Sequence, residues 1–537
     1  MAKQPKRPKQ PTELSLESIL WNCRNELRGI GGTDNKRDAV IGLVFLKFAG
    51  DKFYKRRHEI EVECSDDKGL LEILIEKPSS YNAHNVFYLR ETSRWEHIKK
   101  NASANDIAVI VDTAMKDIET DNPSLKGALP QRFYVPLNIP KENFKGLIDE
   151  VNKIDKSRFD DEDLIGRVYE YFLQAYAVAG DKEDGEFYTP ACAVKLIAEL
   201  IEPYSGIVYD PCCGSGGMFV QSVKFVESHH GSKSNISIIG QEKTAVTWRL
   251  AKMNLAIRGI SHNLGDKPVS TFLDDQHLDK KVNYIMANPP FNLKKWRGED
   301  ELTDDYRWRG YGVPPVANAN YAWILHMLSK LDVTNGIAGF LLANGALNSN
   351  SVEGTIRKQL IENDKVEAII VLPRDMFYTT DISVTLWIIN NNKKARSLNG
   401  RNLRNRENEV LFVDLRRWDG NVEEYIIDTV KKTKKRKVVF ADAQIAEIKK
   451  IYTSWQTGDG YANVPELCQC VTKNEIAAQN YSLAPSKYIE FIDHDLDIDY
   501  AAEMARIQNE MRLLMVSEKL SQSMLEDAFR GIGYGID

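Results

Sequence analysis

Paired cysteines and metal-binding clusters are missing from this sequence. Its seven cysteines are odd in number and form no CxxC pair, with Cys468 and Cys470 as the closest spacing. The nine histidines show no ligand spacing either. A disulfide framework or a zinc site is therefore not indicated. We expect reduced, buried thiols, no bound metal, and a cytoplasmic protein.

Long apolar runs and a net basic charge are missing as well. No run approaches the ~18 apolar residues of a membrane span, and the start does not read as a signal peptide, so no membrane contact is expected. The net charge is −6, with 28% charged residues, so nothing global indicates a polyanion partner. The basic run at 431–437 is most simply a solvated face. DNA binding must then be local or shared with another chain.

The first part of the chain has a helical pattern. Residues 1–12 are rich in Lys, Arg and Pro, which is typical of a disordered basic tail. From 13 to 158, apolar residues recur at helical spacing, and a second, more apolar helix is expected at 37–48. We expect an α-helical domain for DNA or partner contact, with packing alone as the alternative. A further amphipathic helix is expected at 159–180.

A strand, a glycine-rich turn and a helix form the strongest signal. The apolar strand 206–209 is followed by Asp210, by the turn Gly214, Ser215, Gly216 and Gly217, and by a helix from Phe219. Such a unit opens a nucleotide-binding α/β sheet, and its glycines let backbone N–H groups approach a ligand. Asp210 is placed to accept a hydrogen bond from an ammonium group.

The next expected strand, 236–240, leads to Glu242. A carboxylate after the second strand is where such folds hold ribose hydroxyls. The spacing from Asp210 is 32 residues, longer than the ~20 of dinucleotide folds, and a longer first helix and loop account for it. An exposed acid at a helix start is the alternative for Glu242.

A rigid loop ends a later apolar strand, 282–286. Asn288, Pro289, Pro290 and Phe291 follow it, and each proline removes a backbone donor. The loop is suited to an exocyclic amine on a base: Asn288 Oδ1 and the Pro289 carbonyl accept its two hydrogens, and Phe291 stacks on the ring. An Asn-Pro turn that merely closes a strand is the alternative for this tetrapeptide alone.

A turn upstream completes the expected pocket. Thr189 suits an N-cap and Pro190 the first position of a helix at 191–201. The turn could wall the pocket around a cofactor carboxylate, or be a plain helix start; its residues are Glu186, Phe187, Tyr188, Thr189 and Pro190. An ammonium site, a ribose acid and an amine pocket along one sheet edge together predict S-adenosylmethionine and methyl transfer to an amino nitrogen.

These motifs carry a family resemblance. The sequence from Asp210 to Gly217, together with 288–291, is similar to the signature of DNA adenine-N6 methylases. The segments 185–190, 250–259, 319–323, 341–345 and 372–380 resemble the modification subunit of type I restriction–modification systems. One position departs from the family pattern: relatives carry an acid where this chain has Ser270, at the loop that meets the cofactor's adenine. Asp274 is a candidate substitute.

The resemblance implies a fold and a set of partners. The fold is α/β, with a doubly wound S-adenosylmethionine-dependent methyltransferase sheet at 159–485, the α-helical domain at 13–158 and a helical C-terminal tail at 486–537. The implied partners are double-stranded DNA, a specificity subunit, a second copy of this chain and, for cleavage, a restriction subunit. Two apolar stripes within 504–524 suit the tail to docking on a partner helix, with folding back on its own domain as the alternative. An RNA or protein amino-methyltransferase and a non-catalytic scaffold are the rivals.

Overall fold

The computed structural model describes residues 16–155, 189–349, 351–377, 382–418, 422–428, 433–492 and 500–531. The chain divides into a unit at 1–489 and a unit at 490–537. The predicted basic tail at 1–12 and the helix predicted at 159–180 lie outside the described residues. The domain boundaries expected from the sequence stay predictions.

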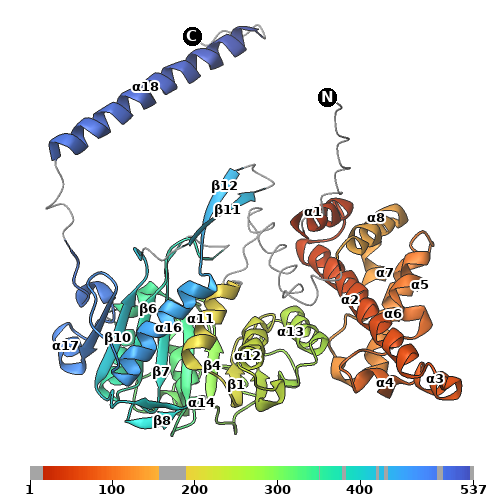
Figure 1. Ribbon diagram of the computed structural model, residues 1–537, viewed down its shortest axis with the longest axis horizontal. Coiled ribbons are helices and arrows are strands. Elements are labelled where there is room, and N and C mark those ends of the chain that lie inside the picture. The colour runs from red at the N-terminus through yellow and green to blue at the C-terminus, as the bar shows by residue number, and fades with distance from the viewer. Residues whose placement is uncertain are drawn as a thin grey trace, which may run out of the picture. The chain divides into compact units, whose positions relative to one another are not determined.

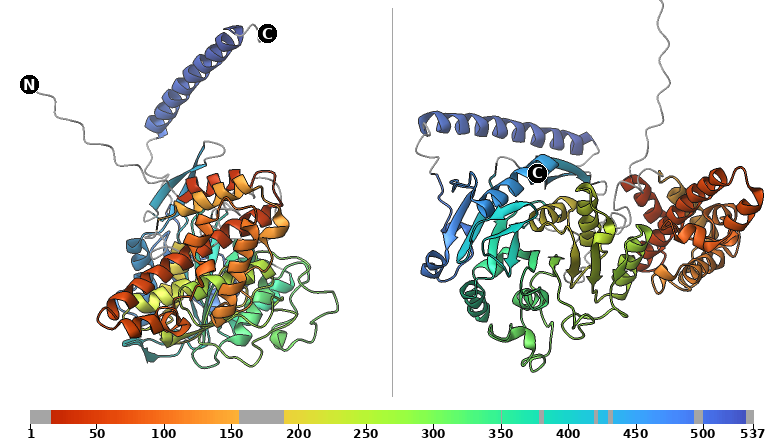
Figure 2. Two further views of the ribbon diagram at one scale, coloured as in Figure 1. Left: turned by 90° about the vertical axis from the view of Figure 1, so that its right-hand side faces the viewer. Right: turned by 60° about the horizontal axis from the view of Figure 1, so that its bottom comes forward.

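The N-terminal part is a helical domain, as predicted. Its helices pack around one apolar core and appear as one group beside the sheet domain in Figures 1 and 2. The helices are α1 (Leu16–Glu26), α2 (Thr33–Glu63), α3 (Lys68–Leu74), α4 (Pro78–Asn82), α5 (Trp95–Lys100), α6 (Ile107–Asp121), α7 (Tyr134–Leu137) and α8 (Lys141–Asn152). The helix expected at 37–48 therefore lies in the first half of a 31-residue helix.

A nine-stranded sheet forms the second part, counted over the described residues. Its order is β13-β10-β6-β7-β5-β4-β1-β2-β3, and β7 runs antiparallel to both of its neighbours. The strands are β1 (Gly206–Asp210), β2 (Ile236–Gly240), β3 (His262–Asn263), β4 (Tyr284–Ala287), β5 (Ile337–Ala343), β6 (Val366–Val371), β7 (Val384–Asn390), β10 (Glu409–Asp414) and β13 (Cys468–Thr472). Two hairpins lie outside it: β8 (Arg396–Leu398) with β9 (Arg401–Leu403), and β11 (Val422–Asp428) with β12 (Thr433–Val439).

Both faces of this sheet are covered by helices. Neighbouring strand residues alternate between two apolar clusters: Val208 belongs to one and Tyr209 to the other. This alternation explains why the strands read as nearly continuous apolar runs. It confirms the doubly wound α/β fold. The covering helices are α11 (Ala191–Ile201), α12 (Gly217–Ser228), α13 (Ala245–Ile257) and α16 (Asp442–Thr457) with one cluster, and α14 (Asn320–Lys330) and α15 (Val352–Glu362) with the other; a short helix, α17 (Lys473–Ala478), follows β13.

Helix α13 joins the sheet domain to the helical domain. Trp248 and Leu255 pack in the sheet's cluster, whereas Leu250 and Met253 pack in the core of the helical domain. An amphipathic helix buries one face, so a helix with two apolar faces indicates burial from both sides.

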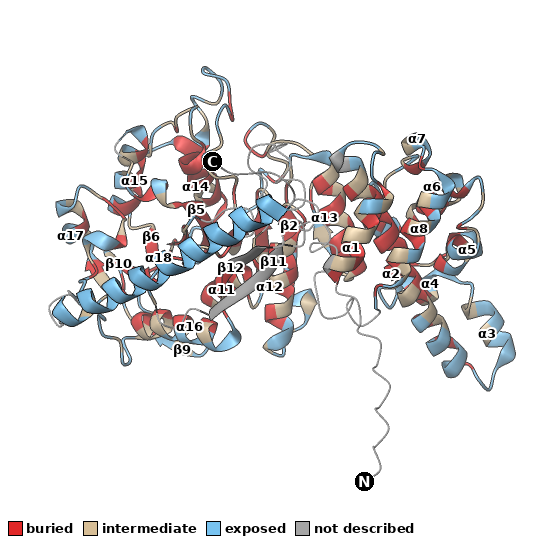
Figure 3. Cartoon of the chain, turned by 90° about the horizontal axis from the view of Figure 1, so that it is seen from above, coloured by how far each residue is buried: buried red, intermediate tan, exposed pale blue. Residues whose placement is uncertain are grey.

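The unit at 490–537 contains α18 (Tyr500–Gly531), a helix of 32 residues. None of its residues is buried, and Figure 3 shows it as exposed along its length. Both predicted stripes are therefore exposed: Met504, Ile507, Met511 and Leu514 form one, and Leu513, Val516, Leu520 and Met524 form the other.

No helix among the described residues has the length and apolarity to cross a membrane. All seven cysteines are free thiols.

Candidate active site

A cavity of about 550 Å³ lies at the carboxyl ends of β1, β2 and β4. Ligands of open α/β sheets bind at this edge. The cavity brings together eight of the residues that the sequence singled out: Thr189, Asp210, Gly214, Ser215, Gly217, Glu242, Asn288 and Pro290.

Four other candidates are described but do not line the cavity. Pro190 and Gly216 are the N-cap residues of α11 and α12. Pro289 is buried beneath the loop, and the half-buried Phe291 meets Phe377 edge-on with 6.5 Å between ring centroids. The predicted residues Glu186, Phe187 and Tyr188 lie outside the described part of the chain.

The glycine-rich turn is shaped by backbone conformations that glycine tolerates best. Gly214 has φ +52° and Gly216 has φ +82°. A Cβ built on Gly214 would meet no atom within 4 Å, so the turn faces open space there. The Gly214 N–H donates to Glu242 Oε2 at 3.1 Å, which ties the turn after β1 to the acid after β2. This open, backbone-lined cradle fits the amino-acid end of a cofactor.

Asp210 is a buried carboxylate at the end of β1. Its Oδ1 accepts a hydrogen bond from the Cys212 N–H at 2.9 Å. Burial raises the pKa of Asp210 to about 7, and the Cys212 donor only partly offsets that rise. Burial makes the charged form of this carboxylate unfavourable unless a cation lies beside it. The site therefore fits an ammonium ligand.

Glu242 holds two backbone N–H groups. Besides Gly214, its Oε1 accepts from Thr244 N at 2.8 Å. These bonds fix the carboxylate of this half-buried side chain at the cavity wall, and each carboxylate oxygen has a second lone pair for a ribose hydroxyl. The geometry therefore fits the ribose role.

Asn288 is oriented by Thr189, a contact that sequence reasoning missed. The Asn288 Nδ2 donates to Thr189 Oγ1 at 2.9 Å. The predicted helix cap is wrong by one residue: Pro190 is the N-cap of α11, so the Thr189 hydroxyl is free to hold the amide. Asn288 Oδ1 is buried and has no hydrogen-bond partner among the described residues. A buried acceptor without a donor costs free energy, so it points to a ligand that donates.

An aromatic wall closes another side of the cavity. Phe272 lies 4.6 Å from Trp296 and 4.2 Å from Trp323, measured between ring centroids, and all three side chains line the cavity. Phe272 lies close to Ser270 and Trp323 ends the segment 319–323 that carried the resemblance, whereas Trp296 lies in no motif. Since the three rings come from three separate segments, no periodicity in the sequence could have grouped them. Asp274 does not line the cavity; its carboxylate is 2.8 Å from Lys267 Nζ.

Arg307 holds this wall in place from behind. Its guanidinium pairs with Asp305 at 2.6 Å and donates to the carbonyls of Thr271, at 3.3 Å, and Phe272, at 2.7 Å. It also donates to His326 Nδ1 at 3.3 Å. Burial and the Arg307 charge lower the pKa of His326 far below its usual value, so the ring is neutral and donates from Nε2 to the Tyr209 oxygen at 3.0 Å. The segment 294–308 is rich in polar and charged residues, yet it has buried anchors in Trp296, Arg307 and Trp308.

Replacing Arg307 by methionine should leave Asp305 and the two carbonyls without their donor. We expect the free energy of unfolding to fall by about 3–5 kcal/mol, the range for breaking a buried pair. Cofactor should bind more weakly because the Phe272 loop loses its support. Denaturant unfolding and calorimetry measure the two effects. An unchanged dissociation constant in the folded variant would contradict the positioning role.

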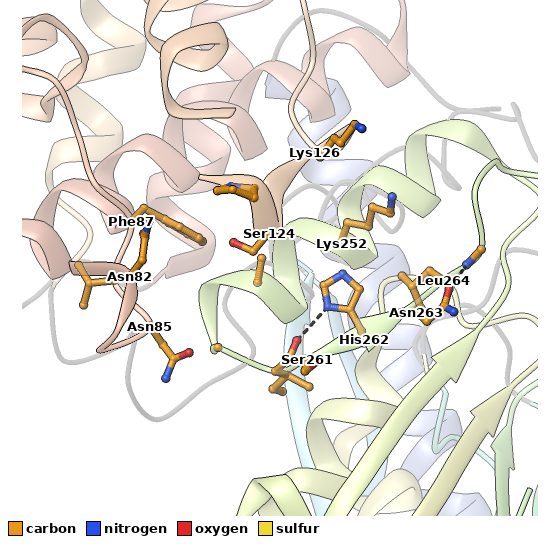
Figure 4. A pocket seen from close by; sticks show the side chains of 16 residues that line it. Asn82, Asn85, Phe87, Ser124, Lys126, Lys252, Ser261, His262, Asn263 and Leu264 are labelled. Carbon is orange, nitrogen blue, oxygen red and sulfur yellow. Dashed lines mark hydrogen bonds between the residues drawn. The ribbon is translucent and has the colours of Figure 1, made fainter. Parts of the chain in front are cut away.

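A second cavity, of about 680 Å³, lies between the helical domain and the α13–β3 region. Ser124 and Lys126 lie across it from Lys252 and His262 (Figure 4). Its lining contains no carboxylate, and Asn288 does not reach it. The residues predicted for the chemistry therefore line the cavity at the sheet edge and not this one.

Comparison with known proteins identifies the family of this chain. The profile of the family described as N-6 DNA Methylase matches residues 160–496, and that of the HsdM N-terminal domain matches 16–151. The HindI type I restriction enzyme methylase subunit of Haemophilus influenzae is 37% identical over 439 residues, which cover 80% of this chain and 93% of the relative. The MjaIX methylase subunit of Methanocaldococcus jannaschii is 32% identical over 539 residues, 97% of this chain and 92% of the relative.

A solved structure shares the fold. The type I restriction-modification system methyltransferase subunit from Streptococcus thermophilus aligns with a TM-score of 0.66 at 21% identity, covering 88% of this chain and 99% of that one. Both family profiles match in the order that the motifs indicated, which confirms the resemblance. The chain belongs to the N-6 DNA methylase family and, within it, to the type I restriction enzyme methylase subunits.

Proposed function

We propose that this chain transfers the methyl group of S-adenosylmethionine to the N6 amino group of an adenine in DNA. The observation that carries the proposal is Asn288: its amide is held by Thr189, and its buried Oδ1 lacks a partner among the described residues. Asp210 and Glu242 line the same cavity. The site therefore combines an acceptor for a reacting amine with acceptors for a cofactor.

Several residues would hold S-adenosylmethionine, which supplies an electrophilic methyl group when bound. Asp210 would pair with its ammonium, and the turn from Gly214 to Gly217 would approach its amino-acid end. Glu242 would accept from the ribose hydroxyls. Asp210, Gly214 and Glu242 all line the same cavity, so one bound cofactor can reach them together.

The chain's own contribution to the reaction is to prepare the amine. The N6 lone pair of adenine is delocalised into its ring. Asn288 Oδ1 and the Pro289 carbonyl would accept the two amino hydrogens and localise that pair on nitrogen, while Phe291 would stack on the base. The base must leave the duplex to reach this loop. Exposed Lys243, Lys294 and Lys295 also line the cavity and suit DNA phosphates.

A substrate comparison tests the proposal. Wild-type protein with its specificity subunit should transfer labelled methyl from S-adenosylmethionine to duplex DNA and not to RNA or protein. Label found only in RNA or protein would favour the rival amino-methyltransferases. Cofactor binding without label in any substrate would favour a scaffold.

The names of the relatives and the exposed helix α18 support a proposal about the partners of this chain. The relatives are named as subunits of type I restriction enzymes, so we propose assembly with a specificity subunit, a second copy of this chain and, for cleavage, a restriction subunit. The two bare apolar stripes of α18 give a specificity subunit a place to dock.

Ending the chain at Ile489 should separate assembly from cofactor binding. The truncated protein keeps the unit at 1–489 and should bind S-adenosylmethionine as the full chain does. It should lose co-purification with the specificity subunit and site-specific methylation of DNA, because the docking helix is gone. Pull-down and a methylation assay measure both. A truncated chain that still assembles would contradict the docking role of α18.

A further inference from the structure

The adenine end of the cavity has no carboxylate at its expected place. Asp210 follows β1 and Glu242 follows β2, so a cofactor that lies along the sheet edge from one to the other carries its base onward, toward the loop after β3. That loop provides Ser270, Thr271 and Phe272 to the cavity. A serine cannot offer the charged acceptor that an acid would give an exocyclic amine. Recognition of the base therefore calls for a further group beside the neutral Ser270 hydroxyl.

Trp323 provides a group of the opposite kind. It lies on α14, lines the cavity, and is 5% exposed. Its indole Nε1 is a hydrogen-bond donor that is buried and has no partner among the described residues. A buried Trp N–H normally finds an acceptor. An unpaired donor in the cavity wall beside Phe272 indicates a ligand with an acceptor at this point.

Two other tryptophans, compared with Trp323, each lack one of its two features: an unused Nε1 donor and a place in the cavity wall. Trp296 lines the same cavity, but its Nε1 donates to the Pro315 carbonyl at 2.9 Å. Trp387 also has an unpartnered Nε1, but it lies in strand β7 and does not line the cavity. Of these three, Trp323 alone combines an unused donor with the cavity wall.

We propose that Trp323 Nε1 donates a hydrogen bond to a ring nitrogen of the cofactor's adenine and, with Phe272, replaces the missing acid as the base-recognition element. The inference rests on the proposed function, since it requires an adenosyl cofactor in this cavity. Adenine presents N1, N3 and N7 as acceptors, whereas its one exocyclic group is a donor. A site that reads the ring nitrogens through a neutral N–H does not depend on the ionisation of a carboxylate.

Calorimetry with S-adenosylhomocysteine and its 1-deaza, 3-deaza and 7-deaza analogues tests the proposal. Each analogue lacks one ring acceptor. Wild-type protein should bind at least one of them about fivefold to tenfold more weakly than the parent compound, the size of a neutral hydrogen bond. Trp323→Phe should bind the parent more weakly by a similar factor and should no longer distinguish it from that analogue. Trp387→Phe is the matched control: its Nε1 also has no partner among the described residues, but Trp387 lies in β7 and does not line the cavity, so the variant should keep the wild-type ratio.

The outcomes separate the two proposals. If wild-type protein binds no adenosyl compound, the proposed function fails. If it binds all three analogues as tightly as the parent, the inference about Trp323 is wrong even where the variant cannot be purified. If Trp323→Phe keeps the wild-type ratios, the donor is another group and the inference is also wrong.

Discussion

Asn288→Ala is expected to lower the rate of methyl transfer by about 10²–10³-fold, the range for removing one preorganised hydrogen-bond group from a transition state. The reason is the position of Asn288, which lines the cavity and whose buried Oδ1 has no hydrogen-bond partner among the described residues. The dissociation constant of S-adenosylmethionine should change little because Asp210 and Glu242 remain. Single-turnover transfer of labelled methyl, with calorimetry for the cofactor, measures the two quantities.

Two further variants make this result specific. Thr189→Val should reduce the rate by a smaller factor, since the Asn288 amide keeps its oxygen but loses the contact that orients it. Asn335→Ala is the control: Asn335 is exposed in the turn before β5, at the opposite end of the sheet. Wild-type rates in Asn288→Ala would rule out the amine pocket.

The second large effect concerns Asp210 and pH. Its pKa of about 7 means that the carboxylate is mostly protonated at pH 5.5 and mostly ionised at pH 7.5. Only the ionised form pairs with an ammonium, so cofactor affinity should fall about tenfold per pH unit below 7. Asp210→Asn should remove this dependence and weaken binding at pH 7.5 by about tenfold to a hundredfold, the range for a charge-assisted bond. Calorimetry from pH 5.5 to 7.5 measures both.

The same residue should act on stability in the opposite direction. In the unfolded chain an aspartic acid releases its proton near pH 4, whereas in the folded protein Asp210 holds it to about pH 7. The folded state therefore binds more protons in this window, and Asp210 lowers the stability of the cofactor-free protein as pH rises through it. Asp210→Asn should then unfold at a higher temperature than wild type at pH 8 without cofactor. For cofactor binding, a dissociation constant that does not change from pH 5.5 to 7.5 in wild-type protein would contradict the assignment of Asp210 as the partner of the ammonium group.

Much of the fold followed from local sequence. Strand β2 occupies the predicted residues 236–240, and α11 occupies 191–201. Both are short apolar runs bounded by clear start and stop signals, so local pattern was sufficient. Helix α2 extends to Glu63 beyond the predicted end at 48 because Ala49, Phe53 and Ile60 continue its buried face at helical spacing. Arg56 also pairs with Glu59 and Glu63 there.

The order of the strands and the arrangement of the site depend on contacts between residues that are distant in the sequence. The insertion of β7 between β5 and β6 is a matter of strand pairing, which no single segment encodes. Thr189 and Asn288 are 99 residues apart, so the contact that orients the amide could not be read from local sequence, which favoured a helix N-cap role for Thr189. Trp296 and Arg307 come from a segment that the motifs did not include, and no motif indicated that Phe272 and Trp323 lie together. Motifs identified the polar groups of the site, and the fold supplied their positions.

The most direct test of the account is the chemical position of the methyl group. Duplex DNA is incubated with the wild-type chain, its specificity subunit and S-adenosylmethionine that carries a CD₃ group, then digested to nucleosides and analysed by mass spectrometry. The account predicts N6-(trideuteromethyl)-2′-deoxyadenosine from wild-type protein and its near absence with Asn288→Ala. Label on cytosine, or DNA without label from a complex that binds the cofactor, would contradict it.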